Sequence, residues 1–374
     1  MKLAIISHTE HYKDVQGRIV GWGPTVSELN HLAEHFETIY HVAMLHNTKA
    51  PPSSLPYIHS NIVFVPLPPS GGETLLSKLN ILWQAPKTIA AVRKTLKKVD
   101  AFQLRVPTGI GVFLIPYLTY LNRRQGWYKY AGNWNQKNAP LGYKLQKNML
   151  LKQDRKVTIN GAWPDQPSHC YTFENPCLTL TERKEGVAVI KNKNYTTPFT
   201  FCFVGRLDDA KGVQRIIDAF SKIKLSGVKN IHFIGNGQQL ETYKLHCISL
   251  GLPAVFHGFL PRNEVFEIYR QSDFLLLPST ASEGFPKVIA EGMNFGCIPI
   301  VSNVSSIGQY IDSKNGYVLS HTTASNLEII INEIYKENPN ILKRKAVQGY
   351  TTSSKFTFAH YNQRILQDIL TINN

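Results

Sequence analysis

Residues 282–292 read Ser-Glu-Gly-Phe-Pro-Lys-Val-Ile-Ala-Glu-Gly, with two glutamates eight positions apart and a Gly-Phe-Pro turn directly behind the first. Pro286 is suited to the first position of a helix, because the N–H that proline lacks would be unpaired there. The segment therefore predicts a loop that carries Glu283, followed by a helix. Glu291 would lie about one and a half turns into that helix, at roughly 3.6 residues per turn.

A ligand at the start of such a helix would meet two kinds of group. The free N–H groups of the first turn and the helix dipole favour a phosphate. Carboxylates accept hydrogen bonds from pairs of hydroxyls, such as those of a ribose or a hexose. An anion site beside hydroxyl acceptors is what a sugar nucleotide requires, although an ordinary surface loop before a capped helix would show the same pattern.

Strand and helix patterns alternate on both sides of this segment. In the second half we expect strands at 200–204, 231–234, 255–257, 274–277 and 298–301, and helices at 213–222, 239–250, 263–271 and 287–295. In the first half we expect strands at 3–7, 39–45, 62–66, 101–105 and 127–131, and helices at 25–36, 89–99 and 109–121. Such alternation predicts parallel sheets with crossover helices, hence an α/β fold.

A polar stretch at 191–198 is the best candidate for a linker. The sequence therefore predicts two doubly wound, Rossmann-like domains, at 1–195 and 196–355, that face each other across a cleft. A C-terminal helix within 356–374 would return to the N-terminal domain. In such folds a ligand binds at the carboxyl ends of the strands.

Composition supports a globular protein in a reducing compartment. A chain of 374 residues and 42.3 kDa is too long for one ordinary core. Its five cysteines include no CxxC pair, which argues against a zinc ribbon and a disulfide framework. The longest apolar run, 110–121, is too short to cross a bilayer. We expect a cytoplasmic protein that can sit peripherally on the inner face of the membrane.

Positive charge is concentrated in the first half. Residues 1–195 hold 24 Lys and Arg against 12 Asp and Glu, residues 196–374 hold 17 against 14, and the chain's net charge is +15. The stretch 101–150 has seven basic residues and no acid. A one-sided basic surface points to an anionic partner (phospholipid, nucleic acid or a phosphorylated acceptor), unless it is merely a solvated face.

Three further motifs follow expected strands in the second half. Arg206 and Lys211 share the loop 205–212, where two cations could hold a diphosphate and offset its charge as it leaves. Gly235 and Gly237 would allow close approach of the backbone to a ligand. The stretch 256–259, Phe-His-Gly-Phe, could supply a floor for a nucleobase.

Together these motifs resemble the retaining glycosyltransferases of family 4, which have the GT-B fold. The matching text is Phe-Val-Gly-Arg-Leu at 203–207 with Lys-Gly at 211–212, Ile-Gly-Asn-Gly at 234–237, Phe-His-Gly at 256–258, 272–279, and Glu283 to Glu291 with 296–300. The resemblance implies transfer of a sugar from a nucleotide-diphosphate donor, UDP- or GDP-linked, with retention at the anomeric carbon. Because the sequence contains no Asp-x-Asp, we expect Arg and Lys to hold the diphosphate without a metal, and we expect no further cofactor.

The resemblance also implies roles for particular residues. Arg206 and Lys211 would bind the diphosphate, Glu283 the hydroxyls of the donor sugar and Glu291 the ribose. The catalytic set would be Arg206, Lys211 and Glu283. The residues expected to bind the donor are Gly23, Gly205, Arg206, Lys211, Gly235, Gly237, His257, Gly258, Phe259, Gly284, Phe285 and Glu291. Gly23 belongs to a predicted glycine loop, 21–23, and Gly284 and Phe285 would act through their backbone N–H groups.

The chain departs from the family where many relatives keep a histidine near the reacting sugar. Arg105 stands at about that place here, while His8 and His11 could face the acceptor. We expect a saccharide or a polyprenyl-linked saccharide as acceptor, and an anionic membrane as a partner of the basic domain. The alternatives are a GT-B epimerase or hydrolase of sugar nucleotides, and a basic nucleic-acid-binding protein. A nucleic-acid partner is not expected, because the charge misses the half that carries the motifs.

Overall fold

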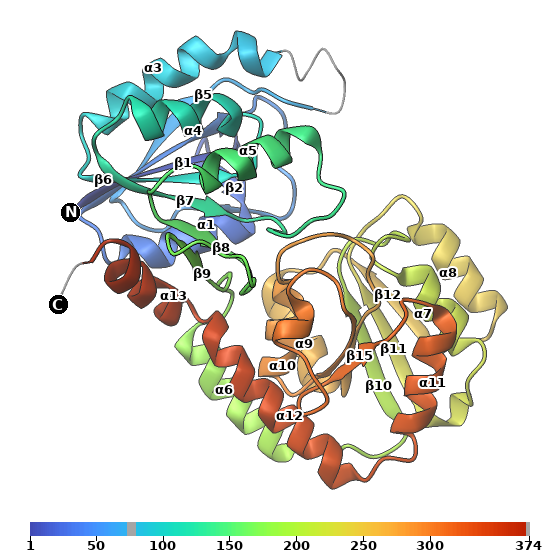
Figure 1. Ribbon diagram of the computed structural model, residues 1–374. Helices are drawn as coiled ribbons and strands as arrows, with labels where there is room; N and C mark the ends of the chain where they lie inside the picture. Colours follow the sequence, from blue (N-terminus) through green and yellow to red (C-terminus); the bar gives the residue numbers. More distant parts are fainter. Residues whose placement is uncertain (73–79, 372–374) are drawn as a thin grey trace. The chain divides into compact units, whose positions relative to one another are not determined.

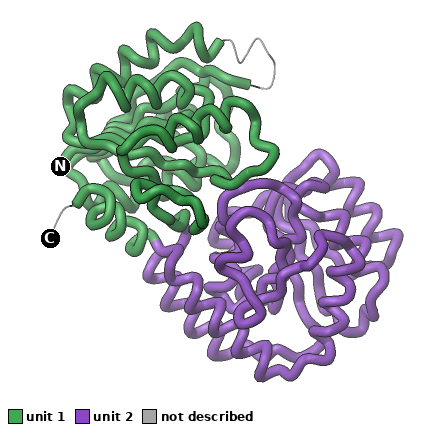
Figure 2. Tube along the Cα trace, in the orientation of Figure 1, with its two compact units in different colours: residues 1–175, 358–374 green, residues 176–357 purple. Residues whose placement is uncertain are grey.

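The computed structural model describes residues 1–72 and 80–371, which divide into two compact units (Figures 1 and 2). Unit 1 comprises Met1–Asn175 and Phe358–Asn374, and unit 2 comprises Pro176–Thr357. The sequence placed these borders at 195/196 and 355/356. The first border lies earlier because helix α6 (Leu180–Asn192) packs on α10 (Lys287–Asn294) and α12 (Pro339–Ser353) of unit 2.

Unit 2 contains a six-stranded sheet in which all paired strands are parallel. Its strands are β10 (Phe199–Val204), β11 (Val228–Ile234), β12 (Ala254–Gly258), β13 (Phe274–Leu277), β14 (Ile298–Ser302) and β15 (Tyr317–Leu319). The spatial order is β12-β11-β10-β13-β14-β15, so the direction of winding changes between β10 and β13. Ligands of doubly wound sheets bind at this switch point.

The central strands of unit 2 are apolar on both faces because helices cover both sides of the sheet. β13 reads Phe-Leu-Leu-Leu and is fully buried, and Phe201 of β10 stacks on Phe274 with ring centroids 5.3 Å apart. The covering helices are α6, α7 (Val213–Phe220), α8 (Leu240–Ser249), α9 (Arg262–Gln271), α10, α11 (Ala324–Ile334) and α12. The last strand predicted for this half is 298–301, but β15 adds an edge strand after it.

Unit 1 contains a nine-stranded sheet with the same winding. Its strands are β1 (Lys2–Lys13), β2 (Ile19–Trp22), β3 (Thr38–Leu45), β4 (Ser54–Pro56), β5 (Ile62–Leu67), β6 (Ala101–Val106), β7 (Gln125–Tyr130), β8 (Val157–Ile159) and β9 (Cys170–Thr172). The parallel strands follow the order β5-β3-β1-β6-β7-β8-β9.

β1 is longer than expected because its register shifts between Ile6 and Glu10, and its far end pairs with the antiparallel strand β2. The residues predicted as a glycine loop, 21–23, therefore form the end of β2 and the first residue of α1 (Gly23–Ala33).

The two faces of the unit 1 sheet bury separate cores because alternate residues of a strand point to opposite faces. Ala4 and Ile6 pack with α3 (Ala85–Leu96), α4 (Gly111–Tyr120) and α5 (Leu141–Leu151). Leu3 and Ile5 pack with α1 and α13 (Phe358–Arg364). Figure 1 shows α3, α4 and α5 on one side of the sheet and α1 with α13 on the other.

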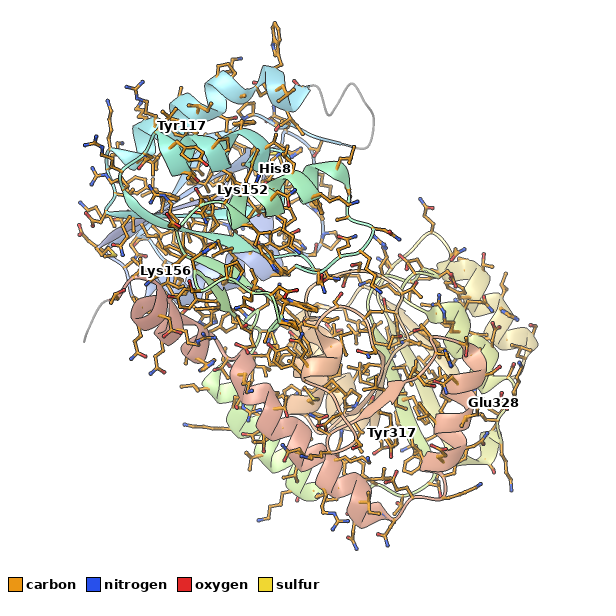
Figure 3. All side chains as sticks on the ribbon, in the orientation of Figure 1. His8, Tyr117, Lys152, Lys156, Tyr317 and Glu328 are labelled. Carbon is orange, nitrogen blue, oxygen red and sulfur yellow. The ribbon has the colours of Figure 1, made fainter. Side chains whose placement is uncertain are left out.

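The C-terminal segment belongs to unit 1. A single helix was predicted within 356–374, but α13 begins at Phe358 and continues as a π-helical turn, Ile365–Ile369, while residues 372–374 lie outside the described residues. Lys156, labelled in Figure 3, donates from Nζ to the carbonyls of Asp368 (2.7 Å) and Ile369 (3.0 Å) and so holds this end of the chain. None of the helices within 1–72 and 80–371 has the length and apolar character that a membrane span requires.

Candidate functional site

An ion pair lies at the switch point of the unit 2 sheet. Lys211 follows β10, Glu283 follows β13, and these strands are neighbours in the sheet. Because the carboxyl ends of parallel strands meet at one edge, the two loops come together, and Lys211 Nζ donates to Glu283 Oε1. The Lys211 side chain is 14% exposed and that of Glu283 is 47% exposed, so the pair opens to solvent on its acidic side.

Arg206 lies on the same loop but is far more exposed, with 69% of its side chain accessible. Its Nε donates to Asp208 Oδ2, and the backbone N–H of Lys211 donates to Asp208 Oδ1 (2.8 Å). Burial raises the pKa of Asp208, but the hydrogen bonds from Arg206 and Lys211 outweigh it and leave that pKa lowered. An ionised Asp208 therefore orients the guanidinium of Arg206 and fixes the backbone at Lys211, a role that the sequence did not predict.

Glycines let three of these loops touch backbone to backbone. A Cβ on Gly235 would lie 1.9 Å from the carbonyl oxygen of Gly205, and one on Gly237 would lie 2.1 Å from that of Leu207. The Gly205 N–H donates to Ile234 O (3.0 Å), and the Gly235 N–H donates to Gly258 O (2.8 Å). The structure thus brings the predicted glycines together at the carboxyl edge of the sheet.

His257 and Phe259 follow the same edge but differ in environment. His257 Nε2 lies 2.9 Å from Nδ1 of His232 on the neighbouring strand. Burial lowers the pKa of His257; burial and then the nearby His257 lower the pKa of His232 to about 4. Phe259 is 42% exposed. His232 was not predicted, since its partner lies on another strand.

The segment 282–292 forms an anchored loop and a short helix. The Phe285 ring is buried against Phe356, with centroids 4.5 Å apart. α10 begins at Lys287, as the predicted bounds 287–295 have it, but Pro286 is the N-cap and not the first helical residue. Within the described residues, the backbone N–H groups of Gly284, Phe285 and Lys287 donate to no protein acceptor. They leave an electropositive helix start beside Glu283.

Glu291 forms an ion pair with a different cation, Arg262. Its Oε1 is 3.6 Å from Arg262 Nη2, and Arg262 also donates to Glu182 and to the carbonyl of Cys177. Burial raises the pKa of Glu291, although Arg262 and Lys287 act in the opposite direction. Arg262 is the first residue of α9 and follows β12. The sequence did not predict it as a site residue, and its place after a strand end is the signal that could have identified it.

Arg105 is buried within unit 1. Its Nη2 donates to Glu28 Oε1 (2.8 Å), and its Nε donates to Gln103 Oε1 (3.0 Å). Lys129 Nζ donates to both oxygens of Glu28 at 2.7 Å. Arg105 therefore belongs to a buried ionic cluster and is not presented to a ligand at this position.

His11 is also buried, and it belongs to a closed ring of hydrogen bonds. His41 joins Ser7 Oγ (2.8 Å) to the Tyr57 hydroxyl (2.6 Å), and that hydroxyl lies 2.8 Å from His11 Nε2. His11 Nδ1 reaches the Thr9 carbonyl (3.0 Å), while the Thr9 N–H donates to Ser7 Oγ (3.3 Å). Burial lowers the pKa of His11 to about 4 and holds the pKa of His41 well below its ordinary value, so both rings are neutral donors and acceptors. The ring holds the irregular part of β1.

His8, labelled in Figure 3, lies inside that irregular stretch. Its side chain lines a cavity of about 320 Å³. The cavity is also lined by Glu10, Tyr12, Trp22 and Ser53, and Trp22 is half exposed. His8 Nε2 lies 3.1 Å from Ser70 Oγ, and burial lowers the pKa of His8. An indole face beside hydroxyls, an imidazole and a carboxylate suits a carbohydrate.

Comparison with known proteins identifies the kind of domain. Residues 188–351, most of unit 2, match the family "Glycosyl transferases group 1". A glycogen synthase from Thermodesulfovibrio yellowstonii is 28% identical over 165 residues, 41% of this chain and 33% of that protein. A lipopolysaccharide 1,6-galactosyltransferase from Salmonella typhimurium is 32% identical over 111 residues, 28% of this chain and 30% of that protein. The matched stretches thus span about a third of each relative.

The whole chain shares its fold with a solved structure. The crystal structure of Anabaena Alr3699/HepE in complex with UDP covers 100% of both chains, with a TM-score of 0.72 and 15% identity. The predicted pair of Rossmann-like α/β domains and the resemblance to glycosyltransferases are therefore confirmed. Assignment to family 4 and the roles of the site residues stay predictions.

Proposed function

We propose that this protein transfers a sugar from a nucleoside-diphosphate donor, UDP- or GDP-linked, to a saccharide or lipid-linked saccharide. The observation that carries the proposal is the meeting of Lys211 and Glu283 at the switch point, beside free N–H groups at the start of α10. This edge offers a cation and backbone donors to a diphosphate, and a carboxylate to sugar hydroxyls. The family of unit 2 and the neighbour solved with UDP support it.

In this proposal Arg206 and Lys211 hold the diphosphate, Glu283 holds hydroxyls of the sugar and Glu291 holds the ribose. The acceptor oxygen forms a bond to the anomeric carbon while the bond from that carbon to the diphosphate oxygen breaks. The acceptor's proton passes to a phosphate oxygen of the donor, on the face from which the nucleotide leaves, so configuration is retained. The two cations stabilise the charge that accumulates on the leaving group, without a metal.

The acceptor side of the proposal rests on the cavity at the end of β1. His8, Glu10 and Ser53 supply hydrogen-bonding groups there, and Trp22 supplies a face for a sugar ring. Trp22→Ala should therefore weaken the acceptor more than the donor. Glycan arrays, with the donor's KM as reference, would measure this difference.

The proposal is tested by sugar transfer with Arg206→Met and Lys211→Met, beside Lys222→Met as a control on an exposed lysine of unit 2. Thermal stabilisation by uridine, guanosine and adenosine sugar nucleotides identifies the donor first. Loss of one cation should lower kcat by ~100-fold or more, because a preorganised charge then no longer meets the leaving group. Wild-type rates in both variants would rule out the proposed role of Arg206 and Lys211 in holding the diphosphate. Product formed without any acceptor would instead assign a sugar-nucleotide epimerase or hydrolase.

A further inference from the structure

The helix layer α3–α4–α5 of unit 1 carries a strong excess of positive charge. Residues 80–153 include thirteen Lys and Arg but a single acid, Asp100, whose carboxylate accepts a hydrogen bond from the backbone nitrogen of Lys2 (2.7 Å). Of the thirteen cations, Arg105 and Lys129 are neutralised inside the unit by Glu28. Most of the others lie on exposed or half-buried positions of the three helices and their connections.

Four of these cations line one open groove, of about 460 Å³, between the C-terminal ends of α3 and α4. They are Arg93 and Lys97 of α3 and its end, and Arg123 and Arg124 after α4; we call this the basic groove. Across the described part of the chain, none of the four has a carboxylate within ion-pair distance. Unpaired cations that converge on a groove favour an anion of matching size.

Hydrogen bonds from Arg155 hold the backbone of the loop that follows α4 in the basic groove. The guanidinium of Arg155 donates to the carbonyl of Arg124 (2.7 Å) and to that of Asn122. These bonds hold the backbone of the loop and leave the side chains of Arg123 and Arg124 accessible. The groove is thus preorganised, which lowers the entropy lost when a ligand binds.

Large apolar side chains stand in solvent at both ends of the layer. Tyr120 and Leu121 adjoin the basic groove and are 72% and 76% exposed, while Leu82 and Trp83 precede α3 and are 57% and 83% exposed. Between them, the outer side of α3 presents Lys87 and Lys94. Aromatic and aliphatic side chains beside lysine and arginine are typical of surfaces that lie in a membrane interface.

We propose that the α3–α4–α5 layer docks on an anionic phospholipid membrane, with headgroup phosphates in the basic groove and Tyr120, Leu121 and Trp83 in the interface. The apolar groups decide between partners, because a nucleic-acid backbone offers nothing to exposed leucines. Membrane docking implies that the acceptor of the proposed sugar transfer is carried by a lipid. This implication rests on the proposed function.

Vesicle flotation tests the docking directly. The probes are vesicles of phosphatidylcholine alone and of phosphatidylcholine with about a third phosphatidylglycerol. The first variant replaces Arg93, Lys97, Arg123 and Arg124 with glutamine, and the second is Tyr120→Ser/Leu121→Ser. The matched control replaces four exposed lysines of unit 2 with glutamine: Lys222, Lys224, Lys229 and Lys244.

Each groove cation should contribute roughly five-fold to partitioning, so the groove variant should bind the anionic vesicles at least about 100-fold more weakly. The serine variant should also bind more weakly, and the unit 2 control should bind like wild type. Binding of wild type should fall when salt is raised.

Equal loss in the groove variant and the unit 2 control would overturn the proposal, because net charge alone would explain it. So would flotation that ignores phosphatidylglycerol, or a wild type that shifts a DNA duplex but floats with no vesicle. Thermal stabilisation by the sugar nucleotide, measured on the same variants, keeps this test separate from the proposed activity. If docking fails while the sugar nucleotide still binds, the proposal of a membrane-docking surface is wrong and the proposed transferase function is unaffected.

Discussion

Glu283→Gln should separate binding of the nucleotide from use of the sugar. In the free protein Glu283 neutralises Lys211, so a diphosphate must compete with a carboxylate for that ammonium. Glutamine keeps the shape and one oxygen acceptor but removes the charge. The variant should therefore bind the free nucleoside diphosphate more tightly and transfer sugar more slowly.

The size of the first effect follows from the exposure of the pair. Two unit charges about 4 Å apart interact by about 1 kcal/mol in water, and the half-exposed Glu283 side chain favours this lower bound. Removing the repulsion between Glu283 and the diphosphate should thus tighten binding by roughly five-fold at low salt, and by less at high salt. Transfer should fall by ~100-fold or more, since the sugar loses a charged partner in the transition state.

Calorimetry with UDP or GDP at two salt concentrations measures the first effect, and kcat/KM of sugar transfer measures the second. Glu267→Gln is the matched control, because Glu267 is exposed and pairs with Arg270 on α9, away from the switch point. If Glu283→Gln weakened the free nucleotide by as much as it slowed transfer, the inference that Glu283 competes for Lys211 would be wrong.

Three further predictions concern residues that support the two candidate sites, the edge of the unit 2 sheet and the cavity of unit 1. Tyr57→Phe removes the hydroxyl that joins two histidines and should lower the free energy of unfolding by about 2–4 kcal/mol in urea titrations; an unchanged midpoint would contradict the closed ring. Gly235→Ala should destabilise by at least about 2 kcal/mol and weaken the nucleotide, whereas Gly142→Ala, with nothing within 4 Å of the new Cβ, should not. The pKa of Glu291 is raised in the folded state, so the stability that its proton contributes is fully present below the unfolded-state pKa and is lost as pH rises through the folded-state pKa. The Tm of Glu291→Gln should therefore rise relative to that of wild type as pH increases. A Tm difference that stays constant with pH would contradict this.

The sequence predicts the parts of the fold whose signal is local. The strand at 274–277 has the predicted bounds because four consecutive apolar residues, bounded by Asp273 and Pro278, indicate a strand buried on both faces. Gly205 and Gly235 directly follow such apolar runs, so their places at strand ends are predicted as well. Since parallel strands bring their carboxyl ends to one edge, the meeting of Lys211 and Glu283 follows from the order of elements alone.

The parts that the sequence did not predict depend on partners far along the chain. His11 and Tyr57 are 46 residues apart, and nothing local shows that they share a ring with His41. Arg105 occupies a place where a reacting group was sought, but Glu28, 77 residues away, buries and neutralises it. Gly21 and Gly23 predict a loop because glycines are typical of turns. In the structure Gly21 is instead required in the strand β2, because a Cβ there would lie 2.3 Å from the ring of His11.

The two units wind their sheets alike, yet their switch points present opposite chemistry. In unit 2 the cation Lys211 stays at the loop surface, with a carboxylate that a ligand can displace. In unit 1 the corresponding edge holds its cation, Arg105, inside a cluster where separation from Glu28 would leave a buried charge unpaired, which typically costs several kcal/mol. What unit 1 offers instead is a cavity without a lysine or arginine in its lining: it holds His8, with its lowered pKa, the indole of Trp22 and the carboxylate of Glu10. We therefore expect the anionic nucleotide to bind at the edge of the unit 2 sheet and the neutral saccharide to bind at that of unit 1, because each edge stabilises only one of these two ligands.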